Sequence, residues 1–225
     1  MQMTPPSWGL ISDNMEDDYR LEVERTVEKC RDNDLILNES KTVKLIIDFR
    51  KNTPTKAPII INNQPISATD SFKFLGTYIN NKLNWDHHTT HLLKTANQRL
   101  FHLRQLRKYR VRKNLMVQFY TAIIQNILSL SITIWYSNTP KHTLHRLGRV
   151  IKRASKIINH TLPTLDSIYK HRTVTRASRI IEDPLHPANH LFQRLPSGRR
   201  FRSPGSRTVR FNNTFFPKAI QLLNS

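Results

Sequence analysis

The sequence predicts an α+β fold, in which a small antiparallel sheet with one helix precedes a helical region and an extended basic tail. Three observations indicate this order. Short alternating apolar runs end near residue 86, apolar residues recur at helical spacing over 87–182, and prolines and arginines become frequent over 183–225. A chain of 225 residues has room for one large domain or two small ones.

A helix is expected over residues 14–31, where apolar side chains fall on one stripe. The stripe consists of Tyr19, Val23, Val27 and Cys30. The helix cap would be Ser12, Asp13 or Asn14. The carboxylates Asp17 and Asp18 fall in the first turn, where they complement the positive end of the helix dipole, and we favour this interpretation over a two-metal site.

Three strand signals follow this helix. Residues 42–49 alternate between apolar and polar, residues 59–66 predict a short hairpin that turns at Asn62-Asn63, and residues 71–79 predict one further strand. Gly76 lies in the middle of the last strand, where another backbone could approach closely. The apolar face of the first strand would carry Val43, Leu45, Ile47 and Phe49.

Helical periodicity begins near Thr89. Its first apolar stripe consists of Leu92, Leu93, Ala96, Leu100 and Leu103. Phe101 is expected to point away from this stripe and Arg107 toward it. A buried helix is expected over 114–131, and residues 132–136 would form either its end or a short strand.

The clearest helical stripe lies over residues 144–158. Its apolar members are Leu144, Leu147, Val150, Ile151, Ala154, Ile157 and Ile158. The opposite side carries Arg146, Arg149, Lys152, Arg153 and Lys156. A further helix is expected around 174–181, and we expect the chain after Asp183 to be extended and partly disordered.

The charge of the chain is strongly positive and unevenly distributed. It has 36 Lys and Arg against 16 Asp and Glu, a formal net charge of +20. Residues 1–50 hold 7 basic and 11 acidic side chains, whereas residues 51–225 hold 29 basic and 5 acidic ones. No carboxylate side chain occurs from His87 to Leu165. This field favours a polyanionic partner, most simply the backbone of RNA or DNA.

The basic residues expected to contact phosphates form three groups. The first lies between two predicted helices and consists of Arg104, Arg107, Lys108, Arg110, Arg112 and Lys113. The second is the basic side of the 144–158 helix. The third includes Arg199 and Arg200 in the tail, with Phe201 and Phe211 interleaved. A solvated helix end is the alternative for the first group, and a solubilising tail is the alternative for the third.

Several classes of protein are disfavoured by composition. The single cysteine, Cys30, excludes an internal disulfide framework and a cysteine-based zinc site, and it indicates an intracellular protein of the nucleus or cytoplasm. The acidic, polar first 30 residues do not resemble a secretory signal. The 5 glycines form no GxG pair, so a glycine-rich phosphate loop is not expected. The uncharged run 114–140 contains several polar residues, so we expect a buried helix and no membrane span.

The histidines raise the question of a metal site. His87, His88 and His91 could share a helical face, and His186 and His190 are four residues apart. Metal sites usually add a carboxylate or thiolate and further supporting groups, and few such side chains lie near these histidines. We therefore expect structural or surface histidines and no metal ligands.

Several short motifs occur in a fixed order along nearly the whole chain. Those in the first part are Gly9-Leu10-Ile11-Ser12, Leu37-Asn38-Glu39-Ser40-Lys41-Thr42 with Ile47-Asp48-Phe49-Arg50, Phe72-Lys73-Phe74-Leu75-Gly76, and Leu83-Asn84-Trp85. Those in the second part are Gln98-Arg99-Leu100 with Leu106-Arg107, Thr133-Ile134-Trp135-Tyr136, Asp183-Pro184-Leu185-His186-Pro187, Leu195-Pro196-Ser197-Gly198-Arg199-Arg200 and Phe215-Phe216-Pro217. Together they resemble the end of a non-LTR (LINE-type) retrotransposon reverse transcriptase.

This resemblance implies a right-hand polymerase, in which a palm sheet is followed by a helical thumb. Residues 1–86 would be a partial palm with a primer-grip-like hairpin at Phe74, Leu75 and Gly76. Lys41 would occupy the lysine position of the fourth palm motif, which contacts or protonates the phosphates of the incoming nucleotide. Residues 87–182 would be the basic thumb-like region, and residues 183–225 a Pro/Arg-rich tail.

The resemblance also indicates a catalytic deficit. RNA-directed DNA polymerases hold Mg²⁺ through aspartates, and the Tyr-x-Asp-Asp element of this family lies just before the Gly-Leu-Ile-Ser stretch. Counted from Gly9, the aspartate pair would fall near Met3 and Thr4, which are not carboxylates. We therefore expect a catalytically incomplete fragment that retains at most nucleic-acid binding and has no cofactor of its own. The oligomeric state is not indicated.

A second resemblance overlaps the first. Residues 115–158, with Trp135-Tyr136 and the basic helix, resemble the region named after the N-terminus of AlkB-homologue alkylated-DNA-repair proteins. It implies 2-oxoglutarate-dependent dioxygenase and methyltransferase activity in the parent proteins. No histidine is followed two residues later by Asp or Glu, as the usual iron triad requires, and no glycine-rich cofactor turn occurs. Three hypotheses remain: a non-catalytic reverse-transcriptase fragment, a repair protein of this kind, and a functionless remnant or helical interaction module.

Overall fold

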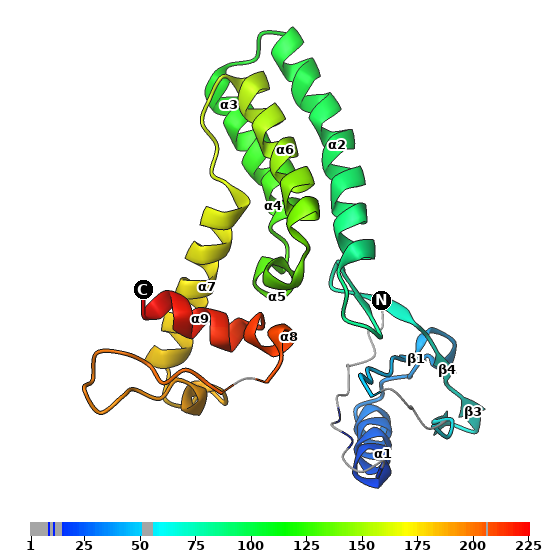
Figure 1. Cartoon of the computed structure of the whole chain (residues 1–225). Helices are drawn as coiled ribbons and strands as arrows, with labels where there is room; N and C mark the ends of the chain where they lie inside the picture. The colour runs from blue at the N-terminus through cyan, green and yellow to red at the C-terminus, as the bar shows by residue number, and fades with distance from the viewer. Residues whose placement is uncertain (1–8, 10, 12–14, 51–55, 206) are drawn as a thin grey trace. The chain divides into compact units, whose positions relative to one another are not determined.

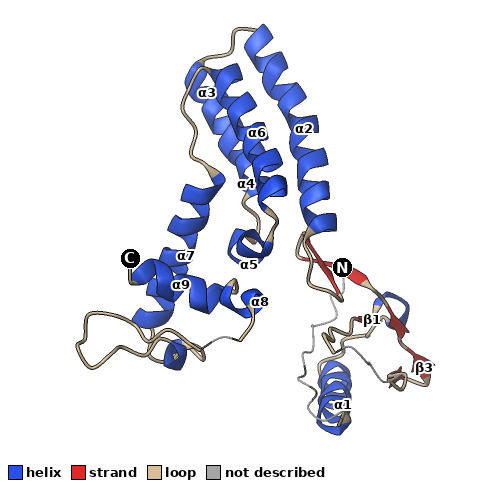
Figure 2. Ribbon diagram, in the orientation of Figure 1, coloured by secondary structure: helices blue, strands red, loops and turns tan. Residues whose placement is uncertain are grey.

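The computed structural model describes residues 9, 11, 15–50, 56–205 and 207–225. The chain divides into two compact units, with Met1–Phe72 and Ile79–Leu83 in unit 1 and Lys73–Tyr78 and Asn84–Ser225 in unit 2. The described part of unit 1 combines one α-helix with short strands, whereas unit 2 is almost entirely helical (Figures 1 and 2). This mixture of helices and small sheets confirms the α+β class.

The core of unit 1 is formed on one side of its helix, α1 (Asp17–Asp32). The stripe predicted for this helix is confirmed, because all of its members contact one apolar cluster. That cluster consists of Tyr19, Val23, Val27, Cys30, Leu37, Ile59, Ile61 and Ile66. Asp17 and Asp18 lie in the first turn of α1, as the helix-dipole interpretation predicts. The expected caps Ser12, Asp13 and Asn14 lie outside the described residues.

The small antiparallel sheet expected in this unit is confirmed only in part, because the described strands form separate two-stranded sheets and one of the pairs is parallel. After η1 (Glu39–Lys41), β1 (Val43–Lys44) pairs in parallel with β4 (Ser67–Ala68). The strand predicted over 42–49 ends at Lys44, and Ile47 and Phe49 are 37% and 57% exposed. No described strand pairs with residues 45–50, so their alternating pattern is not extended into a sheet.

Two tight turns shape the remaining strands. The predicted 59–66 hairpin is confirmed: β2 (Ile60–Ile61) and β3 (Gln64–Pro65) pair antiparallel around Asn62 and Asn63, whose φ values are 47° and 61°. Positive φ at both central residues is typical of the type I′ turn. The single strand predicted over 71–79 is wrong, because β5 (Ser71–Phe74) and β6 (Thr77–Asn80) are separated by a turn at Leu75 and Gly76.

Unit 2 begins with two long helices that pack against each other, α2 (Asp86–Lys108) and α6 (Lys141–Ile158). Both predicted stripes are confirmed: the five apolar residues named for the first are buried, and those named for the second are buried or half-buried. Phe101 points away from the core as expected, with 54% of its surface exposed. The expectation for Arg107 is wrong, because its side chain is exposed in the last turn of α2.

A broken helical stretch lies between α2 and α6. It consists of α3 (Lys113–Phe119), the π-helical turn η2 (Tyr120–Gln125), α4 (Asn126–Leu128), α5 (Ile132–Trp135) and the 3₁₀ turn η3 (Tyr136–Asn138). Residues 132–136 are therefore helical and do not form a strand, but they are not the end of the expected 114–131 helix, because α4 ends at Leu128 and Ser131 has φ = 49°. By length and composition alone, the stretch Lys113–Asn138 could cross a membrane, but it places Tyr120, Leu128 and Trp135 fully inside the core of unit 2.

The last helices form a second core in unit 2. The helix expected around 174–181 is longer, because α7 (Leu165–Glu182) begins at an N-cap, Thr164, whose side chain accepts a hydrogen bond from the Ser167 amide. After it come η4 (Asn189–Leu191), α8 (Val209–Asn212) and α9 (Phe215–Leu223).

The extended tail expected after Asp183 is wrong. α9 packs against α7, and the shared apolar cluster consists of Ala177, Ile180, Phe192, Phe201, Ala219 and Ile220. The Asn224 side chain, directly after α9, joins this end of the chain to Phe201. It accepts a hydrogen bond from the Phe201 amide at 2.8 Å and donates one to the Phe201 carbonyl at 2.9 Å. Burial of these scattered aromatic and aliphatic side chains outweighs the high proline and arginine content.

Candidate nucleic-acid interface

Six basic side chains gather where α2 ends and α3 begins. This set, called the corner cluster, consists of Arg104, Arg107, Lys108, Arg110, Arg112 and Lys113, and all six are exposed. The turn between the helices is held by Val111, whose amide donates to the Leu106 carbonyl at 3.0 Å and whose side chain packs against the core. Arg110 adopts φ = 55°, which reverses the chain direction after the last turn of α2.

The corner cluster carries uncompensated positive charge. None of its members forms an ion pair within the described part of the chain, and residues 87–165 contain 14 Lys and Arg but no Asp or Glu. Arg107 and Lys108 also lie in the last turn of α2, where they face the negative end of the helix dipole. An ordered polyanion at this corner would therefore meet several cations at once, with no carboxylate to repel it.

The second group of basic residues lies on α6. Arg146, Arg149, Lys152, Arg153 and Lys156 are all exposed, as the sequence predicts. Three of them line a shallow hollow of about 140 Å³ between α2 and α6, together with Leu93, Asn97 and Val150. The Arg153 guanidinium donates to the Asn97 side-chain oxygen at 3.4 Å. The hollow is thus basic at its rim and apolar at its floor.

The tail arginines lie apart from the corner cluster. Arg199 and Arg200 are exposed near the tip of a short loop that is closed by a bridge between Arg194 and Phe201. The Arg194 guanidinium lies over the Phe201 ring, 4.9 Å from its centroid. Phe201 is only 8% exposed, so this ring is part of the core and is not free to stack on bases. Figure 1 shows this loop at one end of unit 2 and the α2–α3 connection at the other.

The residues assigned by the polymerase resemblance lie in both units. Lys41 is exposed in η1 of unit 1, and its amide donates to the Asn38 side chain at 3.0 Å. Leu75 and Gly76 form the turn after Phe74, with φ values of 45° and 84°. The positive φ of Gly76 favours glycine there, and a Cβ atom at this position would lie 2.8 Å from the end of the Leu130 side chain, which would have to move. The positions Met3 and Thr4 lie outside the described residues.

The histidines named as possible metal ligands serve other purposes. His88 is fully buried, while His87 and His91 contact the Tyr78 ring at centroid distances of 4.3 and 5.1 Å. His186 accepts a hydrogen bond from the Ala188 amide at 3.1 Å. Across the described ranges, no three His, Cys, Asp or Glu side chains lie together as metal ligands would.

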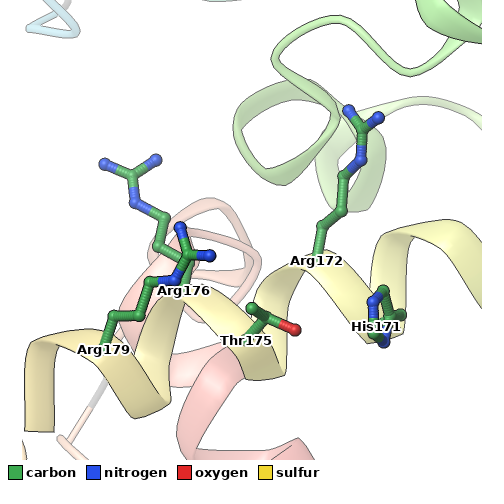
Figure 3. A pocket seen from close by; sticks show the side chains of 5 residues that line it. All are labelled: His171, Arg172, Thr175, Arg176 and Arg179. Carbon is green, nitrogen blue, oxygen red and sulfur yellow. The ribbon is translucent and has the colours of Figure 1, made fainter. Parts of the chain in front are cut away.

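A fourth basic feature lies on α7 and is not predicted by the sequence analysis. It is a hollow of about 480 Å³, called the arginine hollow, and it is lined by His171, Arg172, Thr175, Arg176 and Arg179 (Figure 3). The arginines are four and three residues apart, which places them on neighbouring positions of one helix face. This spacing is visible in the sequence, but the predicted helix began at residue 174 and so excluded Arg172 from the pattern.

Comparison with known proteins gives one partial match. Residues 85–126 match the family model described as "Alkylated DNA repair protein alkB homolog 8, N-terminal". The match includes α2, the corner cluster and the start of the following helical stretch, and it overlaps the resembling segment 115–158 only over 115–126. No curated protein matches the chain significantly. The same is true of the solved structures.

Proposed function

We propose that the chain binds the phosphate backbone of RNA or DNA through the corner cluster and the basic face of α6, without carrying out catalysis itself. The observation that carries this proposal is the absence of any carboxylate over residues 87–165, against 14 basic side chains. Nucleic-acid affinity depends mainly on cations that replace condensed counterions along the phosphates. A helical scaffold that presents such cations without internal ion pairs meets this requirement.

A more specific version of this proposal is that the chain derives from a reverse transcriptase. In this form, unit 1 is a remnant of a palm, and the α2–α6 region acts as a thumb that holds a primer–template duplex by its backbone. The ordered motifs along the chain support it, together with the turn at Leu75 and Gly76 where the resemblance expects a hairpin. Because Met3 and Thr4 stand where the aspartates are expected, the proposal includes binding and no polymerisation.

A second candidate function follows from the family match. The matched family is named after alkylated-DNA repair proteins, and the matched segment contains the whole corner cluster. Turnover of 2-oxoglutarate with Fe(II) would distinguish this candidate from the first, whereas extension of a primer with Mg²⁺ would show that the polymerase function survives. We expect neither activity from the full chain.

The central experiment measures how binding depends on salt. A fluorescently labelled single-stranded oligonucleotide is titrated with the full chain at several salt concentrations, and log K is plotted against log [salt]. We expect a steep negative slope. Each lost phosphate contact lowers the magnitude of the slope by about 0.7 for a single strand, so the quadruple variant should lower it by about three. This variant carries Arg104→Ala, Arg107→Ala, Arg112→Ala and Lys113→Ala.

The matched control removes the same charge from unit 1. Arg25, Lys29, Arg31 and Lys82 are all exposed, and replacing them by Ala lowers the net charge equally. If binding depends on specific contacts at the corner cluster, the control keeps the wild-type slope. An equal reduction in both variants would mean that only net charge matters, and an unchanged slope in the first variant would exclude the corner cluster from the interface.

A further inference from the structure

We propose that the arginine hollow on α7 binds a phosphate dianion, either the terminal phosphate of a nucleic-acid strand or free inorganic phosphate. The site is distinct from the corner cluster and does not depend on it. It comprises three guanidinium groups, one imidazole and one hydroxyl around a space of about 480 Å³. Figure 3 shows Arg172, Arg176 and Arg179 extending to the same side of the helix ribbon.

Two of the three arginines are held in place by contacts that leave donors unused. The Arg172 guanidinium donates to the Ser129 carbonyl at 2.6 Å, which fixes it against the end of α4. The Arg176 guanidinium lies over the Phe215 ring of α9, 5.0 Å from the centroid. A guanidinium has five N–H donors, so each side chain is ordered in advance and still has N–H groups to offer.

The charge around the hollow is unbalanced. No carboxylate lines it. On the same helix, Asp166 is already paired with Lys170 at 2.8 Å, and Glu182, three residues after Arg179, is the one other carboxylate. Arg179 makes no hydrogen bond or ion pair with the residues that the structure describes. Three cations on one helix face repel one another, and an anion bound among them would reduce this repulsion.

A phosphate dianion fits this arrangement better than a carboxylate. Arginine forks bind phosphate oxygens through pairs of parallel hydrogen bonds, and a terminal phosphate presents three such oxygens with about two negative charges. The Thr175 hydroxyl and the His171 ring are the further polar groups at the rim. An internal phosphodiester has a single charge and two free oxygens, so the hollow should prefer a strand end over the continuous backbone.

The test uses the full chain, two probes and two variants. The probes are inorganic phosphate, compared with chloride at equal ionic strength in thermal unfolding, and a pair of oligonucleotides that differ only in a 5′-phosphate. Arg179→Gln removes one cation that makes no hydrogen bond or ion pair among the described residues. Lys170→Gln is the matched control, because it removes one charge from the same helix outside the hollow.

We expect phosphate to raise the melting temperature of the wild type, and the phosphorylated oligonucleotide to bind about tenfold more tightly than its hydroxyl counterpart. Arg179→Gln should lose both effects and keep the affinity for the hydroxyl oligonucleotide, while Lys170→Gln keeps both. A phosphate response without end preference supports the site with free phosphate as its ligand. Wild-type protein that shows neither effect, or Arg179→Gln that retains them, would overturn the proposal.

Discussion

The buried imidazole of His88 makes the stability of unit 2 dependent on pH. Its ring lies between Trp85 and Trp135, at centroid distances of 6.3 and 5.7 Å, and the residue has no exposed surface. Its Nδ1 atom accepts a hydrogen bond from the Tyr78 amide at 3.4 Å, so the proton of the neutral ring lies on Nε2. Within the described residues, that Nε2 group has no hydrogen-bond partner.

Burial lowers the pKa of His88 from 6.5 to about 4, and the neighbouring charges of His91 and His87 act in the same direction. At mildly acidic pH, His88 is therefore protonated in the unfolded chain and neutral in the folded chain. The neutral ring stabilises the folded state fully above the unfolded pKa, and this stabilisation is lost as the pH falls from about 6.5 toward about 4. Between about pH 7 and about pH 5 the loss amounts to about 2 kcal/mol.

The assay is urea unfolding of wild type and His88→Leu at about pH 7 and about pH 5, a range that avoids most carboxylate titration. Leucine fills a similar volume and cannot be protonated, so the variant should lose about 2 kcal/mol less than wild type over this range. His142→Leu is the control, because His142 is exposed on α6. If His88→Leu shows the same pH dependence as wild type, the buried imidazole is not its source.

Three further predictions concern the packing and the turns. Ile220→Ala should lower the free energy of unfolding in urea by about 2–4 kcal/mol, because Ile220 on α9 is 1% exposed and packs in the cluster shared with α7. An unchanged unfolding midpoint would contradict the packing of α9 against α7. Leu75→Gly should raise stability by about 0.5–1 kcal/mol, since Leu75 is 67% exposed and has φ = 45°; a lower melting temperature would refute the strain argument. Thr164→Ala should lower the free energy of unfolding by about 1 kcal/mol, because α7 loses its N-cap hydrogen bond. Thr164→Ser keeps the hydroxyl and should lose much less stability, so equal losses in the two variants would show that the hydroxyl does not cap the helix.

The long helices could be predicted because their core residues recur at a fixed spacing. Leu92 through Leu103 in α2 and Leu147 through Ile158 in α6 fall on single stripes, and no distant partner is needed to recognise such a pattern. The strand over 42–49 shows the same kind of regularity but depends on a neighbouring strand. Only Val43–Lys44 finds one, in β4, more than twenty residues later in the sequence.

The folded tail could not be predicted from local patterns. Phe192, Phe201 and Ile220 share no period, and they become one cluster only when α9 returns to α7. The arginine hollow is not predicted for a related reason: the helix expected from the sequence begins near residue 174, whereas α7 begins after its N-cap Thr164 and so includes Arg172. The corner cluster was easier to find, because its six residues are close in sequence and its main property, the lack of acids, is a matter of composition.

The π-helical turn at Tyr120–Gln125 has a consequence for how this stretch can evolve. Met116, Tyr120, Ile124 and Leu128 are four residues apart, and each is 0–1% exposed. In a regular α-helix, each step of four would rotate the side chain by about 40°, so the last of them would have turned about 120° away from the first. The π-helical turn has more residues per turn, so it offsets this rotation. Deletion of a single residue here could leave a regular helix, but it would rotate Leu128 and Trp135 away from the core. The length of this segment should therefore be under stronger selection than the identity of its exposed residues.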